Sequence, residues 1–281
     1  MLVNLKTILE GTRKDARAVG SFNIYSYETI HGVAAAVKKS GKDAIISFGA
    51  SYLVNMSLKT VVAIVKEVAE ELEQNVALHL DHCTDINIIK NAIDAGFTSV
   101  MYDGSSLSFE ENVKNTKLVC DMAHAKNVSV EAELGSLALG EYSNETDIDH
   151  GQAYTDPSNA KEFVERTDVD ALAVSIGTVH GMYKAKPNIR VDILKAIAKE
   201  VSIPLVLHGG SGTPQELLLE CIDNGICKIN VNTEISQYTV KKIAEKIAEE
   251  PNTHLSKLTL LTSDYVSEIV YKYIDLFNNC K

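Results

Sequence analysis

Three histidines stand at, or just after, the ends of strand-like segments that lie far apart in the sequence: His82, His180 and His208. Three imidazoles with an open fourth position form the usual catalytic zinc site. Asp81 directly precedes the first histidine, and a carboxylate beside a metal ligand can act as a general acid or base. No local motif such as HExxH holds two of the ligands, so the pattern predicts a metal centre assembled by the fold.

Several carboxylates also stand at the ends of strand-like segments. Asp103 ends one strand-like segment, and Glu131 and Glu133 end the next. His79 lies inside the segment that leads to Asp81, where it could orient a neighbouring ligand. Metal-type ligands and carboxylates are therefore expected to meet on one face of the molecule.

A glycine-rich segment follows His208 and leads into a helical pattern. Its backbone amides at Gly209 and Gly210, together with the Ser211 hydroxyl, could hold a phosphate at a helix N-terminus. The alternative is a tight turn that needs glycine for geometry only. Residues 230–233, Asn-Val-Asn-Thr, follow the next strand and bring polar groups to the same corner.

The elements that must position these groups alternate between short apolar runs and stretches with helical periodicity. We expect eight strands, at residues 18–24, 43–49, 76–82, 98–103, 128–133, 171–177, 204–208 and 226–231. We expect helices after them, at 29–39, 58–74, 87–95, 110–126, 159–166, 191–200, 214–224 and 234–250. Eight units of about 30 residues match a (β/α)8 TIM barrel, in which catalytic groups come from the C-terminal ends of the strands. A doubly wound open sheet is the alternative, and the count of eight and the lack of an early GxGxxG favour the barrel.

The chain of 281 residues is expected to form a single domain over residues 1–281, with residues 252–281 as a C-terminal helical extension that packs on the barrel or on a partner subunit. This apolar tail predicts a homodimer or homotetramer. The 27 Lys and Arg residues against 38 Asp and Glu give a net charge of −11, which excludes the electrostatic footprint of a protein that binds nucleic acid or an anionic membrane.

The five cysteines are widely spaced and form no CxxC, so neither a disulfide framework nor a cysteine zinc site is indicated. The N-terminus has no apolar core of a signal peptide, and no apolar run reaches the about 18 residues of a membrane span. A cytoplasmic location is expected.

Seven motifs, in order along nearly the whole chain, resemble those of the class II, zinc-dependent ketose-bisphosphate aldolases, close to the tagatose- and fructose-bisphosphate aldolases. They are SFNI from residue 21, LHLDH from 78, VMYDGS from 100, VEAELG from 130, GTVHG from 177, LVLHGGSG from 205 and KINVNTE from 228. The resemblance implies zinc-dependent retro-aldol cleavage of a ketose 1,6-bisphosphate, of the fructose or tagatose type, to glycerone phosphate and a three-carbon aldehyde such as glyceraldehyde 3-phosphate.

The resemblance also implies a role for individual residues. His82, His180 and His208 match the ligands of one catalytic Zn2+, and Asp81 matches the acid/base for the C4 hydroxyl. Glu133 and Asp103 match acidic positions near the metal, with Glu133 at a second or alternative ion position, so a further monovalent or divalent cation is allowed. Residues matching substrate contacts are Asn23, Ser47, Gly181, Gly209, Gly210, Ser211, Asn230, Val231, Asn232 and Thr233.

Two departures from the family pattern bear on the substrate. The loop after the fifth expected strand has one acid, Glu141, for the proton transfer to carbon, with Glu145 as a substitute. Relatives often carry an Asp-Pro-Arg segment before the last helix, whereas this chain has Asn252-Thr-His-Leu-Ser-Lys257, and its last arginine is Arg190. Losing an arginine removes bidentate recognition of a phosphate.

Two alternatives to a bisphosphate aldolase therefore stay open. The same chemistry could act on a ketose 1-phosphate with a non-phosphate C6 group, such as 6-deoxy-6-sulfofructose 1-phosphate giving sulfolactaldehyde. A non-catalytic barrel subunit that binds sugar phosphate is less favoured, because it has no need of Asp81 and three histidines.

Overall fold

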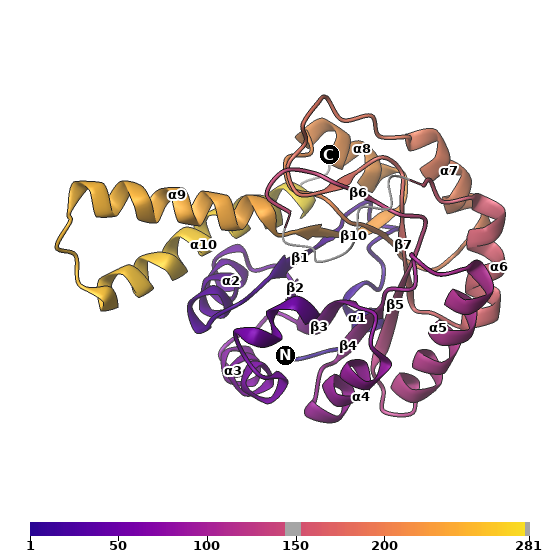
Figure 1. The fold of residues 1–281 in the computed structure, drawn as a ribbon, viewed down its shortest axis with the longest axis horizontal. Coiled ribbons are helices and arrows are strands. Elements are labelled where there is room, and N and C mark those ends of the chain that lie inside the picture. The colour runs from indigo at the N-terminus through magenta and orange to yellow at the C-terminus, as the bar shows by residue number, and fades with distance from the viewer. Residues whose placement is uncertain (144–152, 279–281) are drawn as a thin grey trace.

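The computed structural model describes residues 1–143 and 153–278. Eight parallel strands close into a barrel with the order β1-β10-β9-β7-β5-β4-β3-β2, and helices surround it (Figure 1). The barrel strands are β1 (Val19–Asn23), β2 (Ala44–Gly49), β3 (Val76–Cys83), β4 (Ser99–Tyr102), β5 (Ser129–Leu134), β7 (Ala171–Val174), β9 (Leu205–Leu207) and β10 (Ile226–Val231). The predicted (β/α)8 architecture is confirmed, and each predicted strand overlaps one barrel strand.

A helix follows each barrel strand, and the first seven of these helices connect successive strands, as right-handed parallel crossovers require. They are α2 (Tyr27–Ser40), α3 (Leu58–Glu70), α4 (Ile86–Ala95), α5 (Phe109–His124), α6 (Pro157–Thr167), α7 (Val191–Glu200), α8 (Gln215–Asp223) and α9 (Thr233–Glu249), with a 3-10 turn at Ala50–Val54. Local signals set many of their ends. Ser26 and Ser108 each form a capping box, and Gly41 and Gly96 end α2 and α4 in the left-handed conformation.

The barrel interior is filled in layers. At the N-terminal ends of the strands lies an apolar layer, which the short helix α1 (Leu5–Ile8) closes from below. Two residues further along the strands the interior becomes polar, and every side chain there is fully buried. This second layer consists of Ser21, Ser47, His79, Ser99, Glu131 and Lys228. It forms the floor on which the groups at the C-terminal ends stand.

Two short strands above the barrel were not predicted. β6 (Ala138–Leu139) follows β5, β8 (Val179–His180) follows β7, and they pair in parallel with Leu139 opposite His180. The pairing continues as an antiparallel bridge between Glu141 and Met182. The two loops that follow β5 and β7 are therefore tied together at the mouth of the barrel.

The C-terminal helix α10 (Leu255–Asn278) runs back along α9, and the two form a hairpin that projects from the barrel (Figure 1). The inner part of α10 packs on α2, where the missing side chain of Gly32 admits Val266: a Cβ at Gly32 would lie 2.6 Å from the Val266 Cβ. Of the two predicted positions for the tail, packing on the barrel is thus seen.

None of the helices in the described ranges combines the length and apolarity that a membrane span needs.

Candidate active site

The three predicted metal ligands meet at the C-terminal mouth of the barrel. His82 lies near the end of β3, His180 ends β8 and His208 follows β9, and one ligating atom of each lies within 4.8 Å of the others. The rings of His82 and His208 are 4.5 Å apart at their centroids and nearly perpendicular. Such a set can hold one metal ion and leaves its remaining coordination positions facing the cavity.

Carboxylates fix which nitrogen carries the proton in two of these rings. His82 Nδ1 is 2.8 Å from Asp103 Oδ2, and His208 Nε2 is 2.8 Å from Glu131 Oε1. A carboxylate of low pKa only accepts hydrogen bonds, so these two nitrogens carry the protons. The opposite nitrogens, His82 Nε2 and His208 Nδ1, then present lone pairs to each other across 2.7 Å.

His180 provides the third ring. Its Nε2 is buried and has no hydrogen-bond partner among the described residues. Burial, followed by the neighbouring His82 and His208, holds the pKa of His180 well below its usual value. The ring is therefore neutral, as a metal ligand must be. The backbone carbonyl of His180 accepts from the Gly140 amide at 2.7 Å, so β6 fixes its position.

A local irregularity in β3 lets two adjacent residues serve one site. Successive side chains of a strand point to opposite faces, yet both Asp81 and His82 line the cavity. The register between β3 and β4 shifts between Leu80 and Cys83, and His82 has a φ of 40°. A bulge of this kind re-aims a side chain, and a non-glycine residue at positive φ stores strain where function requires it.

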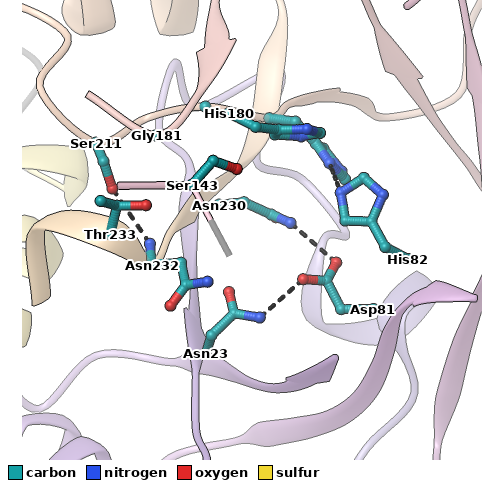
Figure 2. A pocket seen from close by; sticks show the side chains of 12 residues that line it. Asn23, Asp81, His82, Ser143, His180, Gly181, Ser211, Asn230, Asn232 and Thr233 are labelled. Atoms are coloured by element: carbon teal, nitrogen blue, oxygen red, sulfur yellow. Dashed lines mark hydrogen bonds between the residues drawn. The ribbon is translucent and has the colours of Figure 1, made fainter. Parts of the chain in front are cut away.

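Two amides hold the Asp81 carboxylate from both sides (Figure 2). Asn23 Nδ2 donates to Oδ2 at 2.9 Å, and Asn230 Nδ2 donates to Oδ1 at 3.1 Å. Burial alone raises the pKa of Asp81, but His82, Lys228 and His208 outweigh it and hold the pKa well below its usual range. Asp81 is thus an ionised, oriented carboxylate that can accept a proton from a substrate hydroxyl.

The other side of the cavity can bind an anion. Helix α9 begins there at Thr233, and Ser211 Oγ accepts from the amides of Asn232 and Glu234 at 3.3 and 3.2 Å. The N-terminus of a 17-residue helix favours negative charge. Gly209, with a φ of 71°, permits a close approach, since a Cβ there would lie 2.2 Å from the Val179 carbonyl oxygen.

A second cavity lies on the far side of Asp81. It shares Asn23, Asp81 and His82 with the first cavity and extends to the β2 end and the start of α4. Its further lining residues are Gly49, Ala50, Ser51, Tyr52, Cys83, Thr84, Asp85 and Ile88. Over the described residues, neither cavity is lined by lysine or arginine.

Most of the predicted site residues come together. Those that line the first cavity are Asn23, Asp81, His82, His180, Gly181, His208, Gly209, Ser211, Asn230, Asn232 and Thr233. Glu133 lies beside them, with Oε2 3.8 Å from His208 Nδ1, and it forms a second potential ligand group with His82 and Asp103.

Other predicted residues lie further back. Ser47, Gly210 and Val231 are buried and are not among the residues that line the cavities. The side chain of Glu141 is exposed, two residues beyond the end of β6. Glu145 lies outside the described residues. His79 contacts the site indirectly, because its Nε2 is 3.7 Å from Glu131 Oε2.

Two buried residues at the base of the site received no role from the sequence. Glu131 contacts His208, and Lys228 contacts both Glu131 and Asn230. The signal that could have found them is alternation: Glu131 and Glu133 are two residues apart, as are Lys228 and Asn230, so each pair shares the inner face of its strand.

Comparison with known proteins agrees with this geometry. The family described as fructose-bisphosphate aldolase class-II matches residues 3–281. A fructose-bisphosphate aldolase of Geobacillus stearothermophilus is 42% identical over 258 residues, covering 90% of this chain and 88% of the relative. A sulfofructosephosphate aldolase of Alkalicoccus urumqiensis is 37% identical over 250 residues, covering 89% and 86%.

A solved structure extends the match to three dimensions. The crystal structure of the YdjI aldolase from Escherichia coli K12 has a TM-score of 0.87 at 34% identity, and the superposition covers 99% of this chain and 97% of that one. The resemblance found in the sequence motifs is confirmed. The chain belongs to the class II fructose-bisphosphate aldolase family and is an aldolase, a carbon–carbon lyase.

Proposed function

We propose that this protein is a zinc-dependent aldolase that cleaves a ketose 1,6-bisphosphate, of the fructose or tagatose type, to glycerone phosphate and a three-carbon aldehyde such as glyceraldehyde 3-phosphate. The observation that carries the proposal is the position of Asp81 between two cavities and beside three histidines. A substrate that spans both cavities puts its central carbons next to Asp81 and the metal site.

The donor set fits zinc. Neutral imidazoles are its preferred nitrogen ligands, and Asp103 and Glu131 fix which nitrogens of His82 and His208 carry the protons, as carboxylates that contact the ligands of zinc sites do. Zinc held by three neutral rings keeps its positive charge, and as a Lewis acid it stabilises the negative charge that develops on the substrate ketone oxygen. Glu133, with His82 and Asp103, gives room for a second ion position.

The 1-phosphate end of the substrate fits the first cavity. We assign its phosphate to the N-terminus of α9 and to Ser211 and the glycine loop before it, where amides and a hydroxyl converge. Asn232 and Thr233 add polar side chains to the same wall. Binding there orients the C3–C4 bond toward Asp81.

Proton transfer follows from the orientation of Asp81. Its carboxylate removes the proton of the C4 hydroxyl while the C3–C4 bond breaks, so that C4 leaves as the aldehyde carbon and the bonding electrons stay with C3. Asn23 and Asn230 keep both carboxylate oxygens in place during this step. A second acid must then protonate C3, and we assign that role to Glu141, two residues beyond β6, where it bridges to Met182.

A second candidate substrate is a ketose 1-phosphate without a phosphate at C6, such as 6-deoxy-6-sulfofructose 1-phosphate giving sulfolactaldehyde. The second cavity favours it, because the lining residues that the structure describes include no arginine or lysine to neutralise a phosphate dianion. The sulfofructosephosphate aldolase among the relatives supports testing it.

The test is the release of glycerone phosphate from fructose 1,6-bisphosphate, tagatose 1,6-bisphosphate and 6-deoxy-6-sulfofructose 1-phosphate, each with EDTA and after zinc is restored. Zinc-dependent release from a bisphosphate supports the first substrate and identifies its C4 epimer. Release from 6-deoxy-6-sulfofructose 1-phosphate alone supports the second candidate substrate. No release from any of the three would contradict both, and would favour a non-catalytic barrel that binds sugar phosphate.

We also propose that the enzyme acts in the cytoplasm as a homodimer or homotetramer. The exposed side chains of Leu255 and Leu260 on the projecting hairpin support self-association, since they are 71% and 69% exposed in the single chain. Light scattering after size exclusion tests the oligomeric state, and a monomer over the whole concentration range would contradict it.

A further inference from the structure

Among the described residues, one lysine lies in the barrel interior, and none of the functional assignments above uses it. Lys228, on β10, and Glu131, on β5, are both 0% exposed. The Lys228 ammonium lies 3.0 and 2.9 Å from the two carboxylate oxygens of Glu131. A buried ion pair is often no more stabilising than apolar residues of the same volume, so stability alone is a weak reason to place one here.

One set of contacts connects Lys228 to His208, a proposed metal ligand. Glu131 Oε1, which Lys228 contacts, also accepts from His208 Nε2 at 2.8 Å. Because the Lys228 ammonium faces both oxygens of Glu131, this carboxylate accepts from His208 Nε2 and leaves His208 Nδ1 for the metal.

A second set of contacts connects Lys228 to Asp81, the proposed acid/base. Lys228 Nζ donates to Asn230 Oδ1 at 2.7 Å. An ammonium group only donates, so it fixes the amide of Asn230 with its oxygen toward the lysine and its Nδ2 toward Asp81 Oδ1, 3.1 Å away. If the Asn230 amide were flipped, its Oδ1 would face Asp81 Oδ1, and the two oxygens would repel each other.

We propose that Lys228 is a positioning residue that aligns both halves of the reaction centre: through Glu131 it orients the metal ligand His208, and through Asn230 it orients Asp81. The inference rests on the proposed function for the roles of those two residues. It assigns Lys228 no contact with substrate. The lysine acts from one layer below the site, where the barrel interior turns from apolar to polar.

The experiment compares the zinc-loaded wild type with K228M, E131Q and the double variant K228M/E131Q. Methionine keeps the length of the lysine side chain and removes its charge. V206A is the matched control, because Val206 is buried in the apolar interior layer, pairs with Lys228 in the sheet register and is not among the residues that line either cavity. The measurements are kcat and KM, the zinc dissociation constant by competition with a chelator, and the absorption spectrum of the cobalt-substituted protein.

K228M is expected to lower kcat about 100-fold with KM within about threefold, to weaken zinc binding about 10-fold or more and to change the cobalt spectrum. V206A is expected to lower thermal stability while it keeps kcat and zinc affinity within about threefold. The double variant leaves no unpaired charge, so it regains stability relative to K228M, but its kcat stays low because Asn230 has lost the donor that orients it.

A folded lysine-free variant with wild-type kcat and zinc affinity would overturn the proposal. So would a failure of both lysine-free variants to fold, which would make the role of Lys228 purely structural. If the wild type itself cleaves none of the substrates, the proposed function fails. The zinc and cobalt measurements need no turnover and would still decide whether Lys228 orients His208.

Discussion

His82 Nε2 and His208 Nδ1 face each other across 2.7 Å, although the other nitrogen of each ring already donates to a carboxylate. Two lone pairs at that distance repel, and a shared cation removes the repulsion. The polar environment that prepares the two rings for a metal therefore makes the metal-free arrangement unfavourable. We therefore expect binding of the proposed metal to contribute to the free energy of folding.

Zinc is accordingly expected to stabilise the fold. At free zinc 100 times the dissociation constant, binding adds about 2.7 kcal/mol to the free energy of unfolding, which raises the thermal midpoint by about 5 °C or more in a chain of this size. Thermal unfolding in EDTA, and again after zinc is restored, measures the difference. Magnesium, which prefers oxygen ligands, serves as the control ion. Equal midpoints with and without zinc would contradict the assigned ligands.

Asp81→Asn should separate chemistry from binding. The amide keeps the shape of the carboxylate but cannot take a proton, so kcat is expected to fall about 1,000-fold while KM changes little. Steady-state kinetics of glycerone phosphate release checks this. The control is Asp94→Asn, an exposed carboxylate paired with Lys90 and Lys126, and its kcat should match the wild type. Comparable rates for D81N and D94N would remove Asp81 from the mechanism.

Gly209→Ala tests how the glycine loop supports the metal site. At a φ of 71°, the added Cβ would meet the Val179 carbonyl oxygen at 2.2 Å and push on the strand that carries His180. Zinc affinity and kcat are both expected to fall more than about 10-fold. Gly41→Ala has a similar φ of 66° with no atom within 4 Å of the new Cβ, so it costs only about 1 kcal/mol of stability. If both variants bind zinc as the wild type does, the close contact at Gly209 is not needed for the site.

The sequence predicted the barrel because its strands are short apolar runs with helical stretches between them, and both signals are local. It also predicted that His82, His180 and His208 meet, since each stands at or just after the end of a strand-like run. The bulge at Asp81 and His82 could not be foreseen in the same way. Ordinary alternation puts adjacent side chains on opposite faces, and only the register shift against β4 brings both into the cavity.

The pairing of β6 with β8 could not be predicted from the sequence either. Each strand has only two residues and gains its partner only when the loops after β5 and β7 meet. Lys228 was missed for a different reason, and Glu131 was placed on the face with the ligands but given no role. Charged residues in apolar strands favour an exposed edge, whereas a closed barrel has none and turns them inward to pair with each other.

Acid should destabilise the metal-free protein partly through His79. This fully buried ring donates to or accepts from Ser99 and lies 3.7 Å from Glu131. Burial, and next the charge of Lys228, lower the pKa of His79 to about 4, whereas an unfolded histidine titrates near ~6.5. Between these two values the unfolded chain binds a proton that the folded chain does not, so stability is complete above pH ~6.5 and falls as the pH drops toward 4.

The loss assigned to His79 over that interval is of the order of 3 kcal/mol, and H79N should lack it because asparagine does not titrate. Urea unfolding in EDTA at several pH values between 7 and 4 measures the slope for wild type and variant. His180 and His208, whose pKa values are also lowered by burial, keep their share of the slope in both proteins. H254N, at an exposed position, controls for the removal of a histidine as such. If H79N and the wild type lose stability equally between pH 6.5 and 4, the buried ring takes up its proton in the folded state as readily as in the unfolded chain, and the contribution assigned to His79 is absent.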